Sequence, residues 1–152
     1  MVGAFGKYAP YRVVGKGQIM SAEEKILNFS RVVAISGLSS KPGRPSYNVA
    51  NYLKEHGYKI IPVNPTEKEL LGGLCYPDLV SIPESVDVVD IFRRSEEVPP
   101  IVEEAIRIGA KAVWMQEGVT NRKAAARARE AGLMVVMDKC MRKEHQRLKK
   151  RT

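Results

Sequence analysis

A loop rich in glycine and hydroxyl groups, residues 37–46, has the residue types best suited to hold an anion. It reads Gly-Leu-Ser-Ser-Lys-Pro-Gly-Arg-Pro-Ser and leads into a predicted helix. Glycine lets the backbone approach a ligand closely, and a helix N-terminus favours negative charge. Lys41 and Arg44 add positive charge, and a guanidinium can hold a phosphate through two parallel hydrogen bonds. The alternative is an ordinary strand-to-helix turn that carries surface bases.

The glycine spacing in this loop argues against a dinucleotide cofactor. Gly37 and Gly43 are too far apart for the G-x-G-x-x-G pattern. The next predicted strand ends in Asn64-Pro65, where an NAD site places an acidic residue for the ribose hydroxyl. The G-x-x-x-x-G-K-[ST] pattern of P-loop nucleotide hydrolases is also missing from the sequence. The loop therefore predicts a phosphate-bearing ligand other than NAD.

The two cysteines, Cys75 and Cys140, offer a second kind of chemistry. Two thiols cannot build a disulfide scaffold, and no cluster in the sequence has metal-ligand spacing. Cys140 follows the last predicted strand and lies beside Lys139 and the start of a helix, a setting that favours the reactive thiolate. A buried structural thiol is the alternative for Cys140 and the preferred interpretation of Cys75.

The elements that must position these residues follow a regular order. Short β-branched or apolar runs predict strands at 31–36, 58–63, 86–92, 112–115 and 133–137. Asp87 and Asp90 flank one of these runs, and we expect them to be solvated or to act as caps. Ligands of open α/β sheets bind beyond the carboxyl ends of the strands, so the residues just after each run are the candidates for a site.

Helix signals separate the predicted strands. Ser21 and Glu24 form a capping box for a first short helix. Later helices are expected from Pro45 to Gly57, from an N-cap at Ser95 to Gly109, from an N-cap at Thr120 to Gly132, and in the basic tail. This alternation predicts a Rossmann-like, doubly wound α/β fold with a mostly parallel sheet of about five strands and helices on both faces.

Length and charge set the remaining limits. The chain has 152 residues, enough for one domain with a substantial core, which we place at 21–145 between an N-terminal arm (1–20) and a basic tail (146–152). The net charge is +8, and +5 of it lies in residues 141–152. No zinc-finger spacing and no run of aromatics interleaved with bases occurs, so nucleic acid is the least expected partner.

The sequence gives no signal for a membrane or for secretion. No apolar run approaches the roughly 20 residues that span a bilayer, and the N-terminus lacks the pattern of a signal peptide. We therefore expect a cytoplasmic protein with no membrane partner. The arm at 1–20 makes a homodimer plausible.

Five spaced blocks carry a resemblance to a known family. They are VAISGLSSKPGRPSYNVANYL, IIPVNP, VDVVDIFRRSEEVPPIVEEAI, AVWMQEGV and MDKCMRKEH. In this order they resemble the small stand-alone CoA-binding proteins, relatives of the N-terminal domain of the succinyl-CoA synthetase α subunit. The resemblance runs from about Arg31 to His145, most of the chain.

The resemblance implies coenzyme A or an acyl-CoA as ligand and a role for each strand end. The first loop would hold the phosphates through Gly37, Ser39, Ser40, Arg44, Pro45 and Ser46. The end of the second strand would border the adenosine through Val63, Asn64 and Pro65. The next strand end would supply a ring that packs on the ligand and a guanidinium for a phosphate, from Phe92, Arg93 and Arg94. The following one would meet the pantetheine amides through Gln116, Glu117 and Gly118.

Several of these assignments have alternatives. Phe92 suits a core position equally well, and Glu117 could cap the helix that follows it. Cys140 would form a mixed disulfide with CoA if the pantetheine arm reached that edge of the sheet.

Three functions follow, in decreasing order of expectation. The first is a CoA or acyl-CoA binding protein without catalysis of its own. The second is a thiol-dependent enzyme that acts through Cys140 on CoA disulfides or thioesters. The third is a nucleic-acid-binding protein. Ligase activity is not expected, because His56 and His145, the only histidines, do not follow a predicted strand and no second domain is expected.

Overall fold

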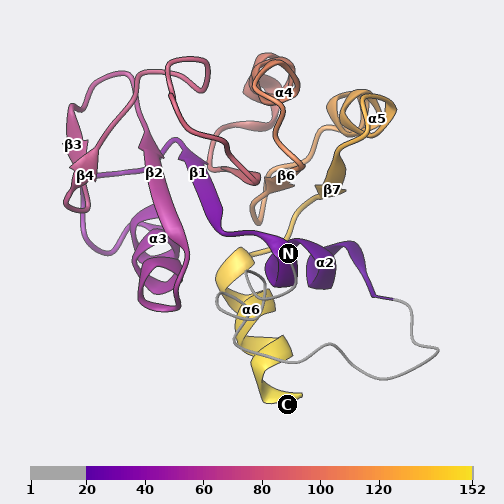
Figure 1. Cartoon of the computed structure of the whole chain (residues 1–152), viewed down its shortest axis with the longest axis horizontal. Helices are drawn as coiled ribbons and strands as arrows, with labels where there is room; N and C mark the ends of the chain where they lie inside the picture. Colours follow the sequence, from indigo (N-terminus) through magenta and orange to yellow (C-terminus); the bar gives the residue numbers. More distant parts are fainter. Residues whose placement is uncertain (1–19, 152) are drawn as a thin grey trace.

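The computed structural model describes residues 20–151 and builds them around one main sheet (Figure 1). Within these residues the sheet has five parallel strands in the order β2-β1-β5-β6-β7. Their bounds are Val32–Ser36 (β1), Lys59–Val63 (β2), Val88–Ile91 (β5), Ala112–Met115 (β6) and Met134–Val136 (β7). The Rossmann-like prediction is confirmed, and each strand lies inside its predicted range. The predicted arm falls outside the described residues except for Met20.

The direction in which the strands are added reverses between β1 and β5. From β1 the chain crosses to β2 on one side, and from β2 it returns past β1 to β5 on the other. The loops after β1 and β5 therefore leave the sheet in opposite directions. Ser36 lies opposite Ile91 in the register, so the two strands end at the same level. In open α/β sheets the crevice at such a switch point is where ligands bind.

Helices cover both faces of the sheet (Figure 1). One face carries α4 (Val98–Arg107) and α5 (Arg122–Glu130), and the other carries α2 (Ala22–Phe29), α3 (Pro45–Glu55) and α6 (Met141–Lys150). A strand covered on both sides needs apolar residues at successive positions instead of alternation. This explains the β-branched runs of the sequence, in which Val33 to Ile35 and Val88 to Val89 are fully buried.

The connection between β2 and β5 contains a short antiparallel hairpin. It consists of β3 (Glu69–Leu70) and β4 (Gly73–Leu74), joined through Leu71 and Gly72, both of which have positive φ, 52° and 73°. No strand was predicted between residues 63 and 86, because two-residue strands carry no periodicity.

Two predicted helix caps are wrong. The N-cap of α5 is Asn121, whose side-chain oxygen accepts the N–H of Ala124 at 2.9 Å, and not Thr120. Ser95 opens a 3₁₀ turn, η1 (Ser95–Glu97), that precedes α4. The Ser95 hydroxyl instead accepts the Thr120 N–H at 2.9 Å, so it ties the loop after β5 to the loop after β6.

The two aspartates near β5 behave differently from each other. The carboxylate of Asp87 accepts the N–H groups of Arg31 and Val32 at 2.8 and 2.9 Å, which is the expected capping role. Asp90 corrects the prediction: it is 0% exposed in the middle of β5. Neither of its carboxyl oxygens has a hydrogen-bond partner in the described part of the chain. Burial raises the pKa of Asp90 well above its usual value, because the charged form loses its hydration.

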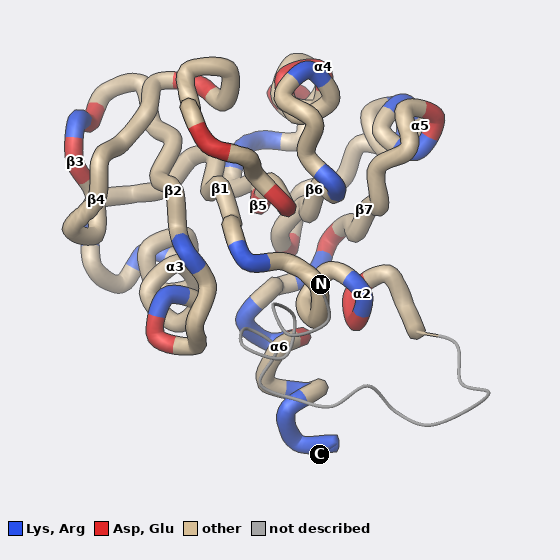
Figure 2. The backbone as a smooth tube through the Cα atoms, in the orientation of Figure 1, with Lys and Arg blue, Asp and Glu red and all other residues tan. Residues whose placement is uncertain are grey.

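The basic tail is the outer side of a helix that packs on the sheet. α6 runs through the expected domain boundary, and its buried side consists of Met141, His145 and Leu148. Figure 2 shows the basic residues that collect at its C-terminal end. None of the helices between residues 20 and 151 has the length and apolar character required to cross a membrane.

Candidate functional site

Two cavities lie at the carboxyl ends of the strands and share Arg93. The first, which we call the switch-point cavity, measures about 370 Å³ and lies between the loops after β1, β5 and β6. Its lining is Gly37, Ser39, Arg44, Pro45, Ser46, Phe92, Arg93, Arg94, Gln116, Glu117 and Val119. The structure therefore brings together most of the residues that the sequence proposed for a ligand site.

The second, which we call the lateral cavity, measures about 450 Å³ and lies beside the end of β2. Its lining is Ser36, Val63, Pro65, Pro77, Asp78, Leu79, Arg93, Glu96, Glu97, Pro100, Ile101 and Glu104. Val63 and Pro65, which the resemblance assigns to the border of the adenosine, line this cavity. The wall facing them comes from the β2–β5 connection and from α4.

Gly37 allows the loops after β1 and β5 to cross closely. Its φ is +86°, and a Cβ placed on it would lie 2.4 Å from the Phe92 carbonyl oxygen and 2.7 Å from Arg93 Cδ. Real side chains do not tolerate such distances, and L-residues disfavour such a φ. The Gly37 N–H donates to the Val63 carbonyl oxygen at 3.0 Å, which fixes the start of the loop.

The hydroxyls of the first loop organise its backbone. Ser46 Oγ accepts the Ser39 N–H at 2.9 Å, and Ser39 Oγ accepts the Lys41 N–H at 3.1 Å. Arg44 is the N-cap of α3, and no side chain of the described residues caps this helix end. Since Pro45 has no N–H, the free donors of the first turn begin at Ser46, which lines the cavity. The loop thus presents backbone donors, a helix N-terminus and an exposed guanidinium to one space.

Ser40 and Asn64 line neither cavity. Ser40 is exposed on the loop. Asn64 connects two loops: its Nδ2 donates to the Leu38 carbonyl at 2.9 Å, and its Oδ1 accepts from both the N–H and the hydroxyl of Thr66 at 2.8 Å. Asn64 therefore fixes the geometry of the strand end next to Pro65.

Arg93 is held by an acidic residue on the turn that precedes α4. Its Nε donates to Glu97 Oε1 at 2.9 Å. Glu97 also receives the N–H of Arg94 at 3.3 Å and Arg94 Nη2 at 3.2 Å. The hydrogen bonds from both arginines lower the pKa of Glu97 to about 2, so its carboxylate is ionised at every ordinary pH.

The loop after β6 connects the switch-point cavity to α6. Gln116 is 4% exposed, and its Oε1 accepts the N–H of Met141 at 3.2 Å. Glu117 does not cap α5; its carboxylate pairs with Lys143 Nζ at 3.0 Å. Both residues line the cavity and also contact the first turn of α6.

The two thiols lie outside both cavities. Cys140 is the N-cap of α6 and is 5% exposed. The ammonium group of its neighbour Lys139 pairs with Glu23 of α2. Cys75 is 7% exposed and its Sγ donates to the Asn64 carbonyl at 3.6 Å. Burial raises the pKa of the Cys75 thiol. No group of three or more His, Cys, Asp or Glu in residues 20–151 could hold a metal ion.

Sequence reasoning missed much of the lateral cavity. Pro77, Leu79 and Ile101 form its apolar sides. The first two lie between the predicted strands at 58–63 and 86–92, where no element was predicted, and the third lies in the helix expected from Ser95 to Gly109. Val119 and Ser36 were missed as well, although their positions at strand ends gave a usable signal.

Comparison with known proteins identifies the family of the chain. The family model described as CoA binding domain matches residues 31–146. The chain is 39% identical over 122 residues to the uncharacterized protein YneT of Bacillus subtilis, which covers 80% of this chain and 90% of YneT. It is 35% identical over 98 residues to the ADP-forming acetate–CoA ligase II of Archaeoglobus fulgidus, but that match spans only 15% of the ligase.

A solved structure supports the same grouping. The hypothetical protein from Pyrococcus horikoshii OT3 superposes with a TM-score of 0.82 at 40% sequence identity, covering 90% of this chain and 98% of that one. The likeness therefore extends over nearly all of both molecules. With the family model matching residues 31–146, the protein belongs to the CoA-binding domain family.

Proposed function

We propose that this protein binds coenzyme A, or an acyl-CoA, as a stand-alone binding protein. The observation that carries the proposal is the switch-point cavity, where the open N-terminus of α3, Arg44 and Arg93 face one space at the reversal of the sheet. The family supplies the class of ligand. We propose that the chain shares the CoA ligand of the ligases. We do not propose ligase activity, since the chain matches only 15% of the ligase's length.

The diphosphate would lie over the first turn of α3. Free backbone N–H groups and the helix dipole stabilise an anion there, and the exposed Arg44 side chain adds a charge-assisted hydrogen bond. The left-handed backbone at Gly37 and Gly43, with φ of 86° and 94°, lets the loop curve around the phosphates.

The adenine would occupy the lateral cavity. A flat aromatic base needs apolar sides and a few polar groups at its edge, and Val63, Pro65, Leu79 and Ile101 supply the sides. Asp78 also lines this cavity, and its carboxylate could accept hydrogen bonds from the exocyclic amino group.

The pantetheine arm would leave the diphosphate along the loop after β6. Phe92 and Val119 offer it apolar contacts, and the carboxylate of Glu117 can accept from its amide N–H groups. An acyl group attached to the thiol would then extend past this rim.

Isothermal titration calorimetry tests the proposal with CoA, NAD and ATP. We expect saturable binding of CoA at micromolar protein and none of NAD. Arg44→Ala should weaken CoA binding about 10-fold or more, because it removes a hydrogen bond between two charged groups. Arg122→Ala, at an exposed position of α5 outside both cavities, is the matched control. Absence of CoA binding in both reduced and oxidised protein contradicts the proposal.

Mixed-disulfide formation at Cys140 stays a prediction. In that reaction the Cys140 thiolate attacks CoA disulfide, forms a Cys140–S–S–CoA bond and releases one CoA thiolate. The side chain is 5% exposed under the first turn of α6, so the reaction requires this turn to open. Mass spectrometry after incubation with CoA disulfide should show a CoA adduct that reductant removes and that Cys140→Ser lacks. An adduct that persists in Cys140→Ser would implicate Cys75 and contradict the prediction.

A further inference from the structure

Arg93 is the residue that joins the two cavities. It lines both of them, whereas the other lining residues belong to one or the other. Its aliphatic stem lies against Gly37, since a Cβ on that glycine would be 2.7 Å from Arg93 Cδ. This packing of the aliphatic stem against the loop after β1 fixes the position of the guanidinium group.

Glu97 fixes how the guanidinium is turned. It takes the Nε–H of Arg93 at 2.9 Å, and its second oxygen is occupied by Arg94. The two terminal nitrogens of Arg93 have no hydrogen-bond partner among residues 20–151. The Nε–H of Arg93 therefore donates to a residue of the protein, and the two terminal nitrogens can donate to a bound anion.

The chemistry of CoA places one particular anion at this junction. CoA carries a diphosphate and, separately, a phosphate on the 3′-oxygen of its adenosine ribose. With the diphosphate at α3 and the adenine in the lateral cavity, the ribose must cross from one cavity to the other. Arg93 is the side chain that both cavities share at this crossing.

We propose that Arg93, positioned by Glu97, binds the ribose 3′-phosphate and so makes the protein select CoA over dephospho-CoA. The inference rests on the proposed function and deepens it. Arg93 is the specificity-determining residue, and Glu97 is a positioning residue that acts through Arg93.

Calorimetry with CoA and with dephospho-CoA tests the role of Arg93. The wild-type protein should bind CoA about 10- to 100-fold more tightly, the range expected for hydrogen bonds between charged groups. Arg93→Met keeps the apolar stem that packs on Gly37 and should bring the two dissociation constants to within about a factor of two, with that for dephospho-CoA nearly unchanged. Equal weakening of both ligands would mean that Arg93 contacts the diphosphate and would overturn the inference.

A double-mutant cycle tests whether Glu97 acts through Arg93. Glu97→Ala should reduce the preference for CoA, and Glu97→Gln, which keeps an acceptor for Nε, should restore part of it. In the Arg93→Met background Glu97→Ala should have no further effect on the preference. A merely structural Glu97 would change thermal stability and the affinities for both ligands together, and so would contradict the positioning role.

Glu103→Ala is the matched control for the change of charge. Glu103 is an exposed residue of α4 that accepts the Nε–H of another arginine, Arg127, at 2.8 Å, but it lines neither cavity. The preference for CoA should be the same in this variant as in the wild type. If the wild type binds neither ligand, the proposed function itself fails; if it binds both equally, only the inference about Arg93 fails.

Discussion

At the scale of single residues, the site depends on how closely two loops can cross. Gly37 is the point of closest approach, because the Phe92 carbonyl oxygen occupies the space that a Cβ would need. Gly43 also has a positive φ, +94°, but no atom lies within 4 Å of a Cβ placed there. A side chain at Gly43 would therefore meet only backbone strain, whereas a side chain at Gly37 would meet both strain and a steric clash.

We predict that Gly37→Ala and Gly43→Ala differ in both stability and binding. Gly43→Ala should cost about 1–2 kcal/mol of unfolding free energy, the strain of an L-residue with positive φ. Gly37→Ala should cost more, because the loops must separate as well, and it should abolish CoA binding. Urea unfolding followed by calorimetry measures both effects. Equal losses in the two variants would show that the close crossing has no role.

Asp90 is a buried acid in the central part of the sheet. Ile35 and Trp114 flank it in the register of the neighbouring strands, and alternation along β5 points its carboxyl toward the face that α2, α3 and α6 cover. Both of its oxygens lack a hydrogen-bond partner in the described residues. Such a group is tolerated when it is protonated, because an uncharged acid costs far less to bury than a carboxylate.

We predict that Asp90 makes the protein less stable as the pH rises. The folded-state pKa is raised above the unfolded value, so the folded protein holds a proton that the unfolded chain releases. The stabilising effect of the protonated acid is complete below pH 3.8 and decreases by up to about 1.4 kcal/mol per pH unit until the folded pKa is passed.

Urea unfolding at a series of pH values above 3.8, compared between the wild type and Asp90→Asn, checks this prediction. Asp90→Asn should flatten the slope of unfolding free energy against pH, whatever its effect on absolute stability. Glu130→Gln, which changes an exposed carboxylate on α5, is the control for loss of a carboxyl group away from the sheet. A slope that is the same in the wild type and in Asp90→Asn contradicts a protonated Asp90.

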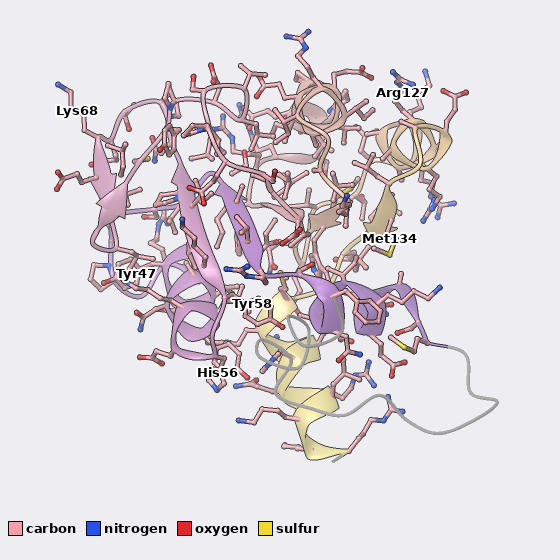
Figure 3. The ribbon with its side chains drawn as sticks, viewed as in Figure 1. Tyr47, His56, Tyr58, Lys68, Arg127 and Met134 are labelled. Carbon is pink, nitrogen blue, oxygen red and sulfur yellow. The ribbon has the colours of Figure 1, made fainter. Side chains whose placement is uncertain are left out.

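At the scale of elements, α6 docks through a cluster of rings near the amino ends of the strands. His145 is 0% exposed, and its Nδ1 lies 2.7 Å from the hydroxyl of Tyr52 on α3. The rings of His56 and Tyr58 lie 5.3 and 5.8 Å from the His145 ring, centre to centre. Figure 3 shows His56 and Tyr58 on the side of α3 and β2 that faces α6. His145 is therefore buried at a position where its protonated, positively charged form would lose its hydration.

We predict that acid destabilises the docking of α6. Burial lowers the pKa of His145 from 6.5 to about 4, with smaller contributions from His56 and Lys149. A lowered histidine pKa means that stability is complete above pH 6.5 and is lost as the pH falls toward 4, by roughly 3 kcal/mol in total. Because Asp90 acts in the opposite direction over this range, comparison of variants is needed to isolate the effect.

The comparison uses two variants that separate charge from hydrogen bonding. His145→Phe removes the titration and keeps a ring, so its unfolding free energy should change less with pH between 4 and 6.5 than that of the wild type. Tyr52→Phe removes only the hydroxyl, so it should lower stability by about 1 kcal/mol while it keeps the wild-type pH dependence. Identical pH profiles for His145→Phe and the wild type would contradict the prediction.

The elements were predictable to different degrees for physical reasons. Strands such as β1 and β6 are buried on both faces, so they appear in the sequence as short apolar runs. Such runs are too short for a helix, and this made the strands predictable. The cap of α5 was predicted one residue early, because Thr120 and Asn121 are both good cap residues and only the backbone decides between them. The packing of α6 on the sheet could not be predicted from the sequence. Most of its residues are basic or polar, and its buried side has only three residues.

The site was predictable where it follows strand ends and was missed where it does not. Gly37, Phe92 and Gln116 come directly after strands, so the rule for parallel sheets placed them together. Leu79 reaches the lateral cavity from an irregular connection that has no such rule. Asp90 was expected to be solvated or to act as a cap, because nothing local distinguishes a buried acid in a strand from an exposed one.

At the scale of the whole molecule, the chain carries a net charge of +8, of which +5 lies in residues 141–152. Three cations of residues 141–152 are paired within the fold: Lys143 with Glu117, Arg147 with Glu144 and Arg151 with Glu24. Deletion of residues 141–152 would remove α6 and with it buried residues such as Leu148. The test of nucleic-acid binding must therefore change charge and leave the helix in place.

We predict only weak, salt-sensitive binding of nucleic acid. Because Lys143, Arg147 and Arg151 are held in ion pairs, we expect no binding of double-stranded DNA at micromolar protein in about 0.15 M salt, where non-specific dissociation constants are typically 10⁻⁴ to 10⁻⁶ M. Any binding at lower salt should depend on the exposed tail cations Lys149 and Lys150. Neutralising both, in Lys149→Gln/Lys150→Gln, should reduce the slope of log affinity against log salt by up to about 1.8, since each phosphate contact contributes about 0.9.

Fluorescence anisotropy over a salt series measures this slope, and calorimetry on the same variant measures CoA binding. Lys149 and Lys150 lie at the C-terminal end of α6. Gln116 and Glu117 of the switch-point cavity contact the opposite end, the first turn of the helix. CoA affinity should therefore be unchanged in the variant while any DNA binding weakens. Tight DNA binding at physiological salt that survives both substitutions would contradict the prediction and would require a basic surface elsewhere on the molecule, such as the exposed side of α5.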